Sequence, residues 1–126
     1  MTDAELVLEA RRVRDRAHAP YSRFQVGAAV LDASGRVYSG CNVENASYGV
    51  TICAERAALC RAVAEGASEI VAVAVIADTA GPVRPCGACR QFLVELAPKA
   101  RVVMANLAGE VDVATAEELL PKRFRM

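Results

Sequence analysis

The stretch EIVAVAVIA, residues 69–77, constrains the fold more than any other part of the chain. Its apolar, largely β-branched residues run almost without interruption, whereas a strand with one solvated face would alternate apolar and polar residues. The pattern therefore predicts a strand that is buried on both faces, and helices are available to cover it. Apolar residues spaced among charges predict an amphipathic helix over 3–18, which ends before Pro20, and further helices are predicted over 53–65 and 85–96.

The remaining strands follow from turn signals and spacing. Two strand-like runs flank Ser34-Gly35, which predicts a β-hairpin, and ARVVMANL at 100–107 precedes a short strand and the helical turn TAEELLP. Only about four residues, LAGE, separate the last two strands, which is too few for a parallel crossover, so these strands should pair antiparallel. We expect an α/β fold in one domain over 1–126, with a mixed five-stranded sheet and helices on both faces.

Charge and hydropathy narrow the classes of function. The chain has 15 Lys and Arg against 15 Asp and Glu, whereas proteins that bind polynucleotides usually carry a basic excess. No apolar run is long enough to span a membrane, and the first residues do not resemble a signal peptide. We expect a cytoplasmic protein without nucleic-acid or membrane partners. Thiols stay reduced in that compartment, so the five cysteines are better explained as metal ligands or buried thiols than as disulfides.

Three of these cysteines predict a metal site. Cys86 and Cys89 form a C-x-x-C pair on one side of a first helical turn, and Cys53 also begins a predicted helix. Helix N-termini stabilise thiolates. Glu55 lies about 200° around the helix from Cys53, so both can reach a metal only if it sits beyond the helix end. Three sulfur ligands would leave a fourth position of a zinc ion open for water, with Glu55 as the base that accepts its proton.

The charge of such a site and the other cysteines leave alternatives. Three thiolates would give a zinc site a net charge of −1, which Arg56 and Arg90, each directly after a site residue, are placed to offset. A C-x-x-C pair alone would also fit a redox pair or half of a zinc knuckle. A structural zinc module would need Cys41 or Cys60 as a fourth ligand; otherwise these two are predicted to be small buried hydrophobic residues.

Several motifs, taken together, resemble the zinc-dependent cytidine deaminases of the small, homotetrameric, three-cysteine type. They are YSRFQVGAAV, GCNVENASYG, CAERAAL, PCGACRQFL and the closing LLPKRF, and they cover nearly the whole chain in order. The resemblance implies a three-layer fold and one Zn²⁺ per chain on Cys53, Cys86 and Cys89. It also implies deamination of cytidine and deoxycytidine to uridine and deoxyuridine in pyrimidine salvage. Glu55 would move a proton from water to the ring nitrogen and then to the departing ammonia, and Arg56 would hydrogen-bond the cysteine sulfurs.

The resemblance further implies how a nucleoside would be held. Asn42 and Glu44 match the N-x-E motif that holds the ribose hydroxyls, and Phe24 matches the aromatic residue that packs on the base. Tyr48 and Phe124 match positions that reach the site of an adjacent subunit, so a homotetramer is expected. The nearest alternative is a deaminase of the same fold that acts on another cytosine nucleoside, such as blasticidin S.

Overall fold

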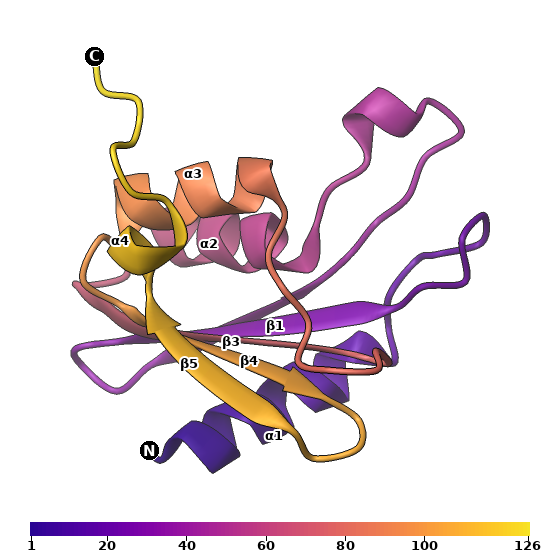
Figure 1. The fold of residues 1–126 in the computed structure, drawn as a ribbon, viewed down its shortest axis with the longest axis horizontal. Coiled ribbons are helices and arrows are strands. Elements are labelled where there is room, and N and C mark those ends of the chain that lie inside the picture. Colours follow the sequence, from indigo (N-terminus) through magenta and orange to yellow (C-terminus); the bar gives the residue numbers. More distant parts are fainter.

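All 126 residues are described by the structure, a computed structural model with very few irregular segments between its elements (Figure 1). No helix in it is both long and apolar enough to cross a membrane. Along the chain the elements are α1 (Asp3–Arg14), β1 (Val26–Asp32), β2 (Val37–Cys41), the 3₁₀ turn η1 (Tyr48–Val50), α2 (Ala54–Ala64), β3 (Ile70–Ala77), α3 (Gly87–Leu96), β4 (Arg101–Asn106), β5 (Val111–Thr115) and α4 (Ala116–Leu119).

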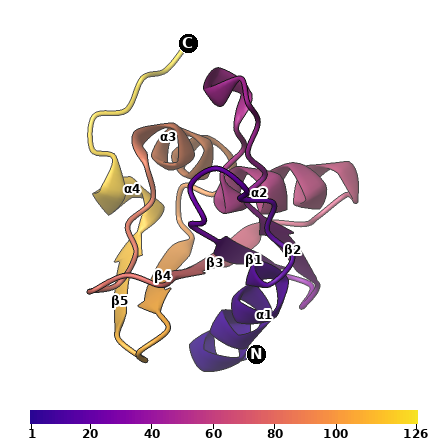
Figure 2. The same cartoon turned by 90° about the vertical axis from the view of Figure 1, so that its right-hand side faces the viewer.

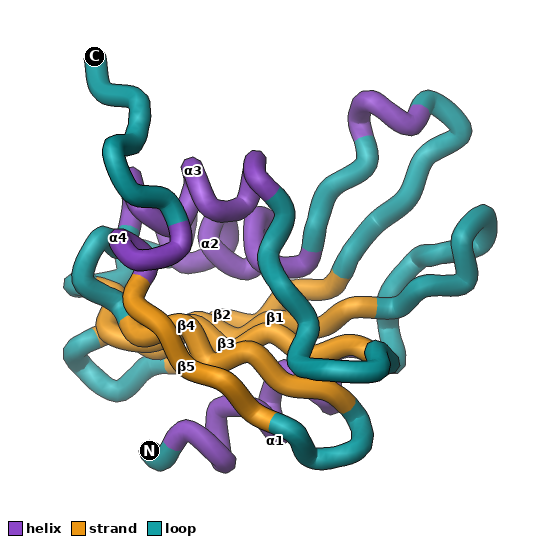
Figure 3. Tube along the Cα trace, viewed as in Figure 1, coloured by secondary structure: helices purple, strands orange, loops and turns teal.

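The strands form one mixed sheet in the order β2-β1-β3-β4-β5. Only β3 and β4 run parallel, joined through α3; the other three neighbouring pairs are antiparallel. Val111 pairs with Ala105 and Thr115 with Arg101, which confirms the antiparallel arrangement predicted for the last two strands. Helix α1 covers one face of the sheet, while α2 and α3 cover the other (Figures 1 and 3). The predicted three layers are therefore confirmed, and the view along the sheet shows them most clearly (Figure 2).

The central strand β3 is buried on both of its faces, as its sequence predicts. Val73 and Val75 belong to the larger core beneath α2 and α3, whereas Ala74 and Ile76 belong to the smaller core against α1. Small residues let the helices lie close to the sheet. A Cβ atom added to Gly40 would come within 2.4 Å of the backbone nitrogen of a residue in α2, so this helix rests directly on the backbone of β2.

Helix α1 is shorter than the sequence predicts, and its buried face is different. A capping box formed by Thr2 and Glu5 begins the helix, but it ends at Arg14 and not near residue 18. Leu6 and Ala10 are buried, whereas Leu8 is 54% exposed. The reason is geometric: residues four apart share one face of a helix, whereas Leu6 and Leu8 are separated by about 200°.

The two cysteines outside the predicted metal site are not buried hydrophobic residues, so that prediction was wrong. Cys60 is exposed and Cys41 is only partly buried. Helix α2 turns Ala54, Ala58 and Ala62 toward the sheet, because these small residues, four apart, permit close contact. Cys60, two positions after Ala58, consequently points away from the sheet.

Candidate active site

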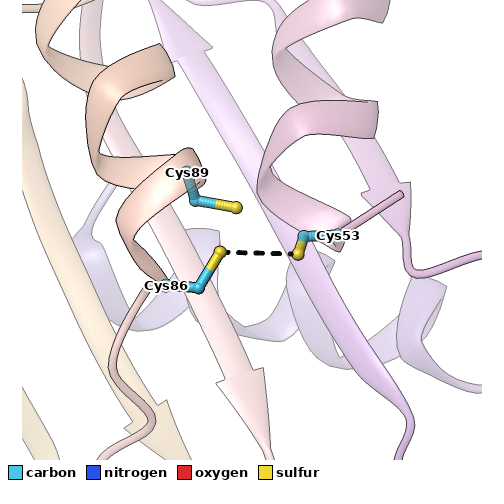
Figure 4. A group of neighbouring side chains, drawn as sticks. All are labelled: Cys53, Cys86 and Cys89. Atoms are coloured by element: carbon cyan, nitrogen blue, oxygen red, sulfur yellow. Dashed lines mark hydrogen bonds between the residues drawn. The ribbon is translucent and has the colours of Figure 1, made fainter. Parts of the chain in front are cut away.

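Two helix N-termini bring three cysteine sulfurs together. Cys53 is the N-cap residue of α2, Cys86 is the N-cap residue of α3, and Cys89 lies in the first turn of α3. The three sulfur atoms lie within 4.8 Å of one another, and the Sγ atoms of Cys53 and Cys86 are 3.7 Å apart (Figure 4). Helices that start 33 residues apart in sequence thus present their sulfurs to one point, as the helix geometry predicts.

This donor set fits a zinc ion. Two sulfurs bound to one tetrahedral zinc at about 2.3 Å should lie about 3.8 Å apart, which agrees with the separation of Cys53 and Cys86. Neither of these side chains caps its own helix by a hydrogen bond, so both sulfurs are available as ligands. No fourth His, Cys, Asp or Glu joins the cluster, and Cys41 and Cys60 lie outside it. Three ligands with one open position are typical of catalytic zinc and not of structural zinc.

An arginine offsets the negative charge of the sulfurs. The Nη2 of Arg56 donates hydrogen bonds to the Sγ of Cys53 and to the carbonyl oxygen of Thr51, each at 3.3 Å. The hydrogen bond from Cys89 and the nearby guanidinium of Arg56 lower the pKa of Cys53 well below its ordinary value. The same contact with Cys53, together with burial, raises the pKa of Cys89. The cluster therefore ionises first at Cys53, the sulfur next to the cation.

Arg90 does not have the charge-offsetting contact that its position after Cys89 suggests. Its Nε donates to the carbonyl oxygen of Pro85 at 2.8 Å, and its Nη1 donates to the carbonyl oxygen of Leu119 at 3.0 Å. Arg90 instead links the loop that precedes Cys86 to the last residue of α4. No pattern along the chain indicates this role, because both acceptors are backbone carbonyls whose position depends on the tertiary fold.

The sulfurs border a pocket of about 240 Å³ that contains a buried acid. Glu55, in the first turn of α2, is only 4% exposed, and this burial raises its pKa to about 7. A carboxyl group with a pKa near neutrality can both accept and release a proton at neutral pH. The pocket is lined by Phe24, Val26, Asn42, Glu44, Thr51, Cys53, Ala54, Glu55, Val83, Arg84 and Cys86.

Three predicted substrate contacts line the pocket together with Glu55. The Oδ1 of Asn42 accepts a hydrogen bond from the backbone N–H of Val26 at 2.8 Å, and its Nδ2 donates to the carbonyl oxygen of Phe24 at 2.7 Å. Glu44 accepts hydrogen bonds from the backbone of residues 21 and 22. Both polar side chains thereby connect the end of β2 to the loop that carries Phe24.

Other lining residues were not predicted from the sequence. Val83 and Arg84 form part of the pocket wall, and Arg84 pairs with Asp112 of β5 through an Nη1–Oδ2 contact of 2.5 Å. Their place directly before Pro85 and Cys86 was the available signal, because a loop that delivers a ligand to a site must pass beside that site.

Tyr48 and Phe124 do not line the pocket of their own chain. Their side chains are 73% and 69% exposed. Tyr48 belongs to η1, and Phe124 belongs to the C-terminal tail that follows α4; these segments lie on opposite sides of the molecule (Figure 1). The ring of Tyr48 makes an edge-to-face contact with Tyr21, at 6.2 Å between centroids. Neither residue can take part in the site within one chain.

Comparisons with known proteins agree with this site. Residues 1–105 match the family model described as the cytidine and deoxycytidylate deaminase zinc-binding region. A cytidine deaminase of Halalkalibacterium halodurans is 54% identical over 94% of this chain and 91% of its own length. The crystal structure of a cytidine deaminase from Burkholderia pseudomallei superposes with a TM-score of 0.95 at 49% identity, covering 98% of this chain and all of the other. That of the Mycobacterium tuberculosis enzyme gives a TM-score of 0.86 at 37% identity and covers both chains fully.

Proposed function

Since this chain belongs to the family of zinc-dependent cytidine and deoxycytidylate deaminases, we propose that it hydrolyses cytidine and deoxycytidine to uridine and deoxyuridine with release of ammonia. The observation that carries this proposal is a buried carboxyl group, Glu55, in one pocket with converging cysteine sulfurs. An acid with a pKa of about 7 beside an open metal position suits the activation of water.

The metal site is assigned to the three sulfurs. Cys53, Cys86 and Cys89 would hold one zinc ion per chain, which as a Lewis acid lowers the pKa of a water molecule. Arg56 stabilises the thiolate of Cys53 by a charge-assisted hydrogen bond. The N-termini of α2 and α3 add their positive dipole ends to this stabilisation.

The proton transfers are assigned to the carboxylate of Glu55. It accepts a proton from the attacking water and donates it to the ring nitrogen of cytosine, while the water oxygen bonds to the amine-bearing carbon. It then transfers the second proton of the water to the departing amine, and the carbon–nitrogen bond breaks to release ammonia. Because Glu55 is buried, bulk water does not compete for the proton during these steps.

The rest of the pocket is assigned to the nucleoside. Asn42 and Glu44 would bind the ribose hydroxyls, and Phe24 would pack on the base; all three line the pocket with Glu55. A homotetramer would allow Tyr48 and Phe124, which are exposed in one chain, to reach the site of a neighbouring subunit. We also propose that residues 1–126 act as one catalytic domain in cytoplasmic pyrimidine salvage, without nucleic-acid or membrane partners.

A direct assay tests the proposal. Purified protein should lower the ultraviolet absorbance of cytidine as it forms uridine, with a zinc-to-chain ratio near one. The substitution Glu55→Gln should reduce the rate by ~10²–10⁴-fold or more and should leave zinc bound. Glu95→Gln, an exposed acid of α3, is the matched control and should behave like the wild type.

Three outcomes would favour other functions. A zinc-loaded protein that releases no ammonia from cytidine is not a cytidine deaminase. Faster turnover of blasticidin S than of cytidine would indicate the other cytosine-nucleoside deaminase. An unchanged Glu55→Gln variant would be consistent with a structural zinc module, although the lack of a fourth ligand argues against that function.

A further inference from the structure

We propose that Ser22 is a positioning residue for nucleoside binding, because its hydroxyl group connects Phe24 to Glu44. This inference rests on the proposed function, which assigns these two pocket residues to the base and to the ribose. Ser22 lies in the loop between α1 and β1, which extends beyond the sheet on the same side of the molecule as η1 (Figure 3).

The hydroxyl group of Ser22 has a partner on each side. Its Oγ accepts a hydrogen bond from the backbone N–H of Phe24 at 3.0 Å, and its O–H donates to the Oε2 of Glu44. The Oε1 of Glu44 accepts from the backbone N–H groups of Tyr21 and Ser22 at 3.0 and 3.1 Å. The hydroxyl is the sole partner of the Phe24 N–H, so its loss would leave this group unpaired and would free Oε2.

The backbone around Ser22 needs such support. Arg23, between Ser22 and Phe24, has a φ of 62°, in the left-handed region that residues other than glycine rarely adopt. Phe24 is held on both sides of this residue's turn, by Ser22 at its N–H and by Asn42 at its carbonyl oxygen. The position of the Phe24 ring in the pocket therefore depends on the two hydrogen bonds to its backbone.

The contacts of Glu44 also define what it can offer to a ligand. A carboxylate has about four acceptor positions, and the loop occupies three of them. The hydrogen bonds from Ser22 keep the pKa of Glu44 below its ordinary value, so the group is a charged acceptor at neutral pH. One acceptor position remains for a ribose hydroxyl. Ser22 thus orients the carboxylate and leaves it one substrate contact.

The test compares Ser22→Ala with Ser22→Thr, which retains the hydroxyl group on an exposed residue that has room for a methyl group. Binding of the product uridine is measured by titration calorimetry, alongside KM and kcat for cytidine. Ser22→Ala should weaken uridine binding and raise KM by about tenfold or more, as expected for a lost hydrogen bond to a charged group. The value of kcat should change little, since Ser22 does not contact Glu55 or the sulfurs. Ser22→Thr should bind uridine like the wild type.

Two further comparisons identify the route of the effect. 2′,3′-Dideoxyuridine lacks the hydroxyls that Glu44 would bind, so Ser22→Ala should weaken its binding by a smaller factor than that of uridine. In a Glu44→Ala background, Ser22→Ala should have a reduced effect, because residues that act through one another are not additive. Ser47→Ala, whose hydroxyl makes no hydrogen bond, is the control and should be unaffected.

The proposal is overturned if Ser22→Ala binds uridine like the wild type, if Ser22→Thr is as impaired as Ser22→Ala, or if the penalty is unchanged in the Glu44→Ala background. These results differ from a failure of the proposed function, in which the wild-type protein itself would not deaminate cytidine.

Discussion

The close contact between α2 and β2 makes Gly40→Ala an informative perturbation. A Cβ atom at residue 40 would lie 2.4 Å from the nitrogen of Ala58, 2.9 Å from its Cα and 3.0 Å from the carbonyl oxygen of Ala54. All three are backbone atoms of α2, so no side-chain rotation can relieve the overlap. Carbon atoms pack at about 3.5–4.0 Å, so the helix must move by about 1 Å or more.

This displacement has a cost in both stability and function. Inserting a methyl group into a well-packed region typically destabilises a protein by about 1–3 kcal/mol. For a chain of this length, that corresponds to a fall of about 4–12 °C in the midpoint of thermal unfolding. The same movement carries Cys53 and Glu55 away from the cysteines of α3, and a misplacement of about 1 Å can reduce a catalytic rate by about 10²-fold.

Thermal unfolding followed by circular dichroism measures the first effect; the zinc-to-chain ratio after dialysis against a chelator and the rate of cytidine turnover measure the second. Gly81→Ala is the matched control, because an added Cβ there meets no atom within 4 Å; its midpoint should stay within about 2 °C of the wild type. A Gly40→Ala protein with wild-type midpoint and wild-type zinc retention would show that α2 does not rest on β2 as described.

Three other predictions concern the clamp, the buried acid and the metal. Arg90→Lys should lower the thermal midpoint nearly as much as Arg90→Met, because one ammonium group cannot span the carbonyls of Pro85 and Leu119; a near-normal Lys variant would indicate a role in charge alone. Hydrogen bonds, first that from Ser34, hold the pKa of Asp32 below its ordinary value, so its stabilisation is present above about pH 4 and is lost as the pH falls further. The thermal midpoint should therefore fall less steeply upon acidification in Asp32→Asn than in the wild type, and equal slopes would contradict this. Removal of zinc by a chelator should lower the wild-type midpoint but not that of a Cys86→Ser variant, because the ion joins α2 to α3.

Much of the fold could be predicted because long apolar runs and short connections leave few arrangements. The run at 69–77 required cover on both faces, and the LAGE connection required an antiparallel pair; both predictions are confirmed. The errors concern exposure. Whether Leu8 or Cys60 is buried depends on which side of a helix meets the sheet, and that side is chosen by small residues such as Ala58 against Gly40.

The core of the candidate site could also be predicted, because helix geometry alone requires Cys53 and Glu55 to meet at the helix end. The contacts of Arg90 and Ser22 could not. Arg90 binds two backbone carbonyls, and Ser22 binds a backbone N–H and a carboxylate from the end of another strand. Such partners are brought together only by tertiary folding, so neither spacing nor residue type indicates them.

The division of the sulfurs between α2 and α3 has a consequence during synthesis on the ribosome. A nascent chain that has emerged only as far as β3 contains a single ligand cysteine of the three, and β3 still lacks its parallel neighbour β4. Tight capture of the metal must therefore wait for nearly the whole polypeptide, so acquisition of the ion marks a late stage of maturation and not its nucleus.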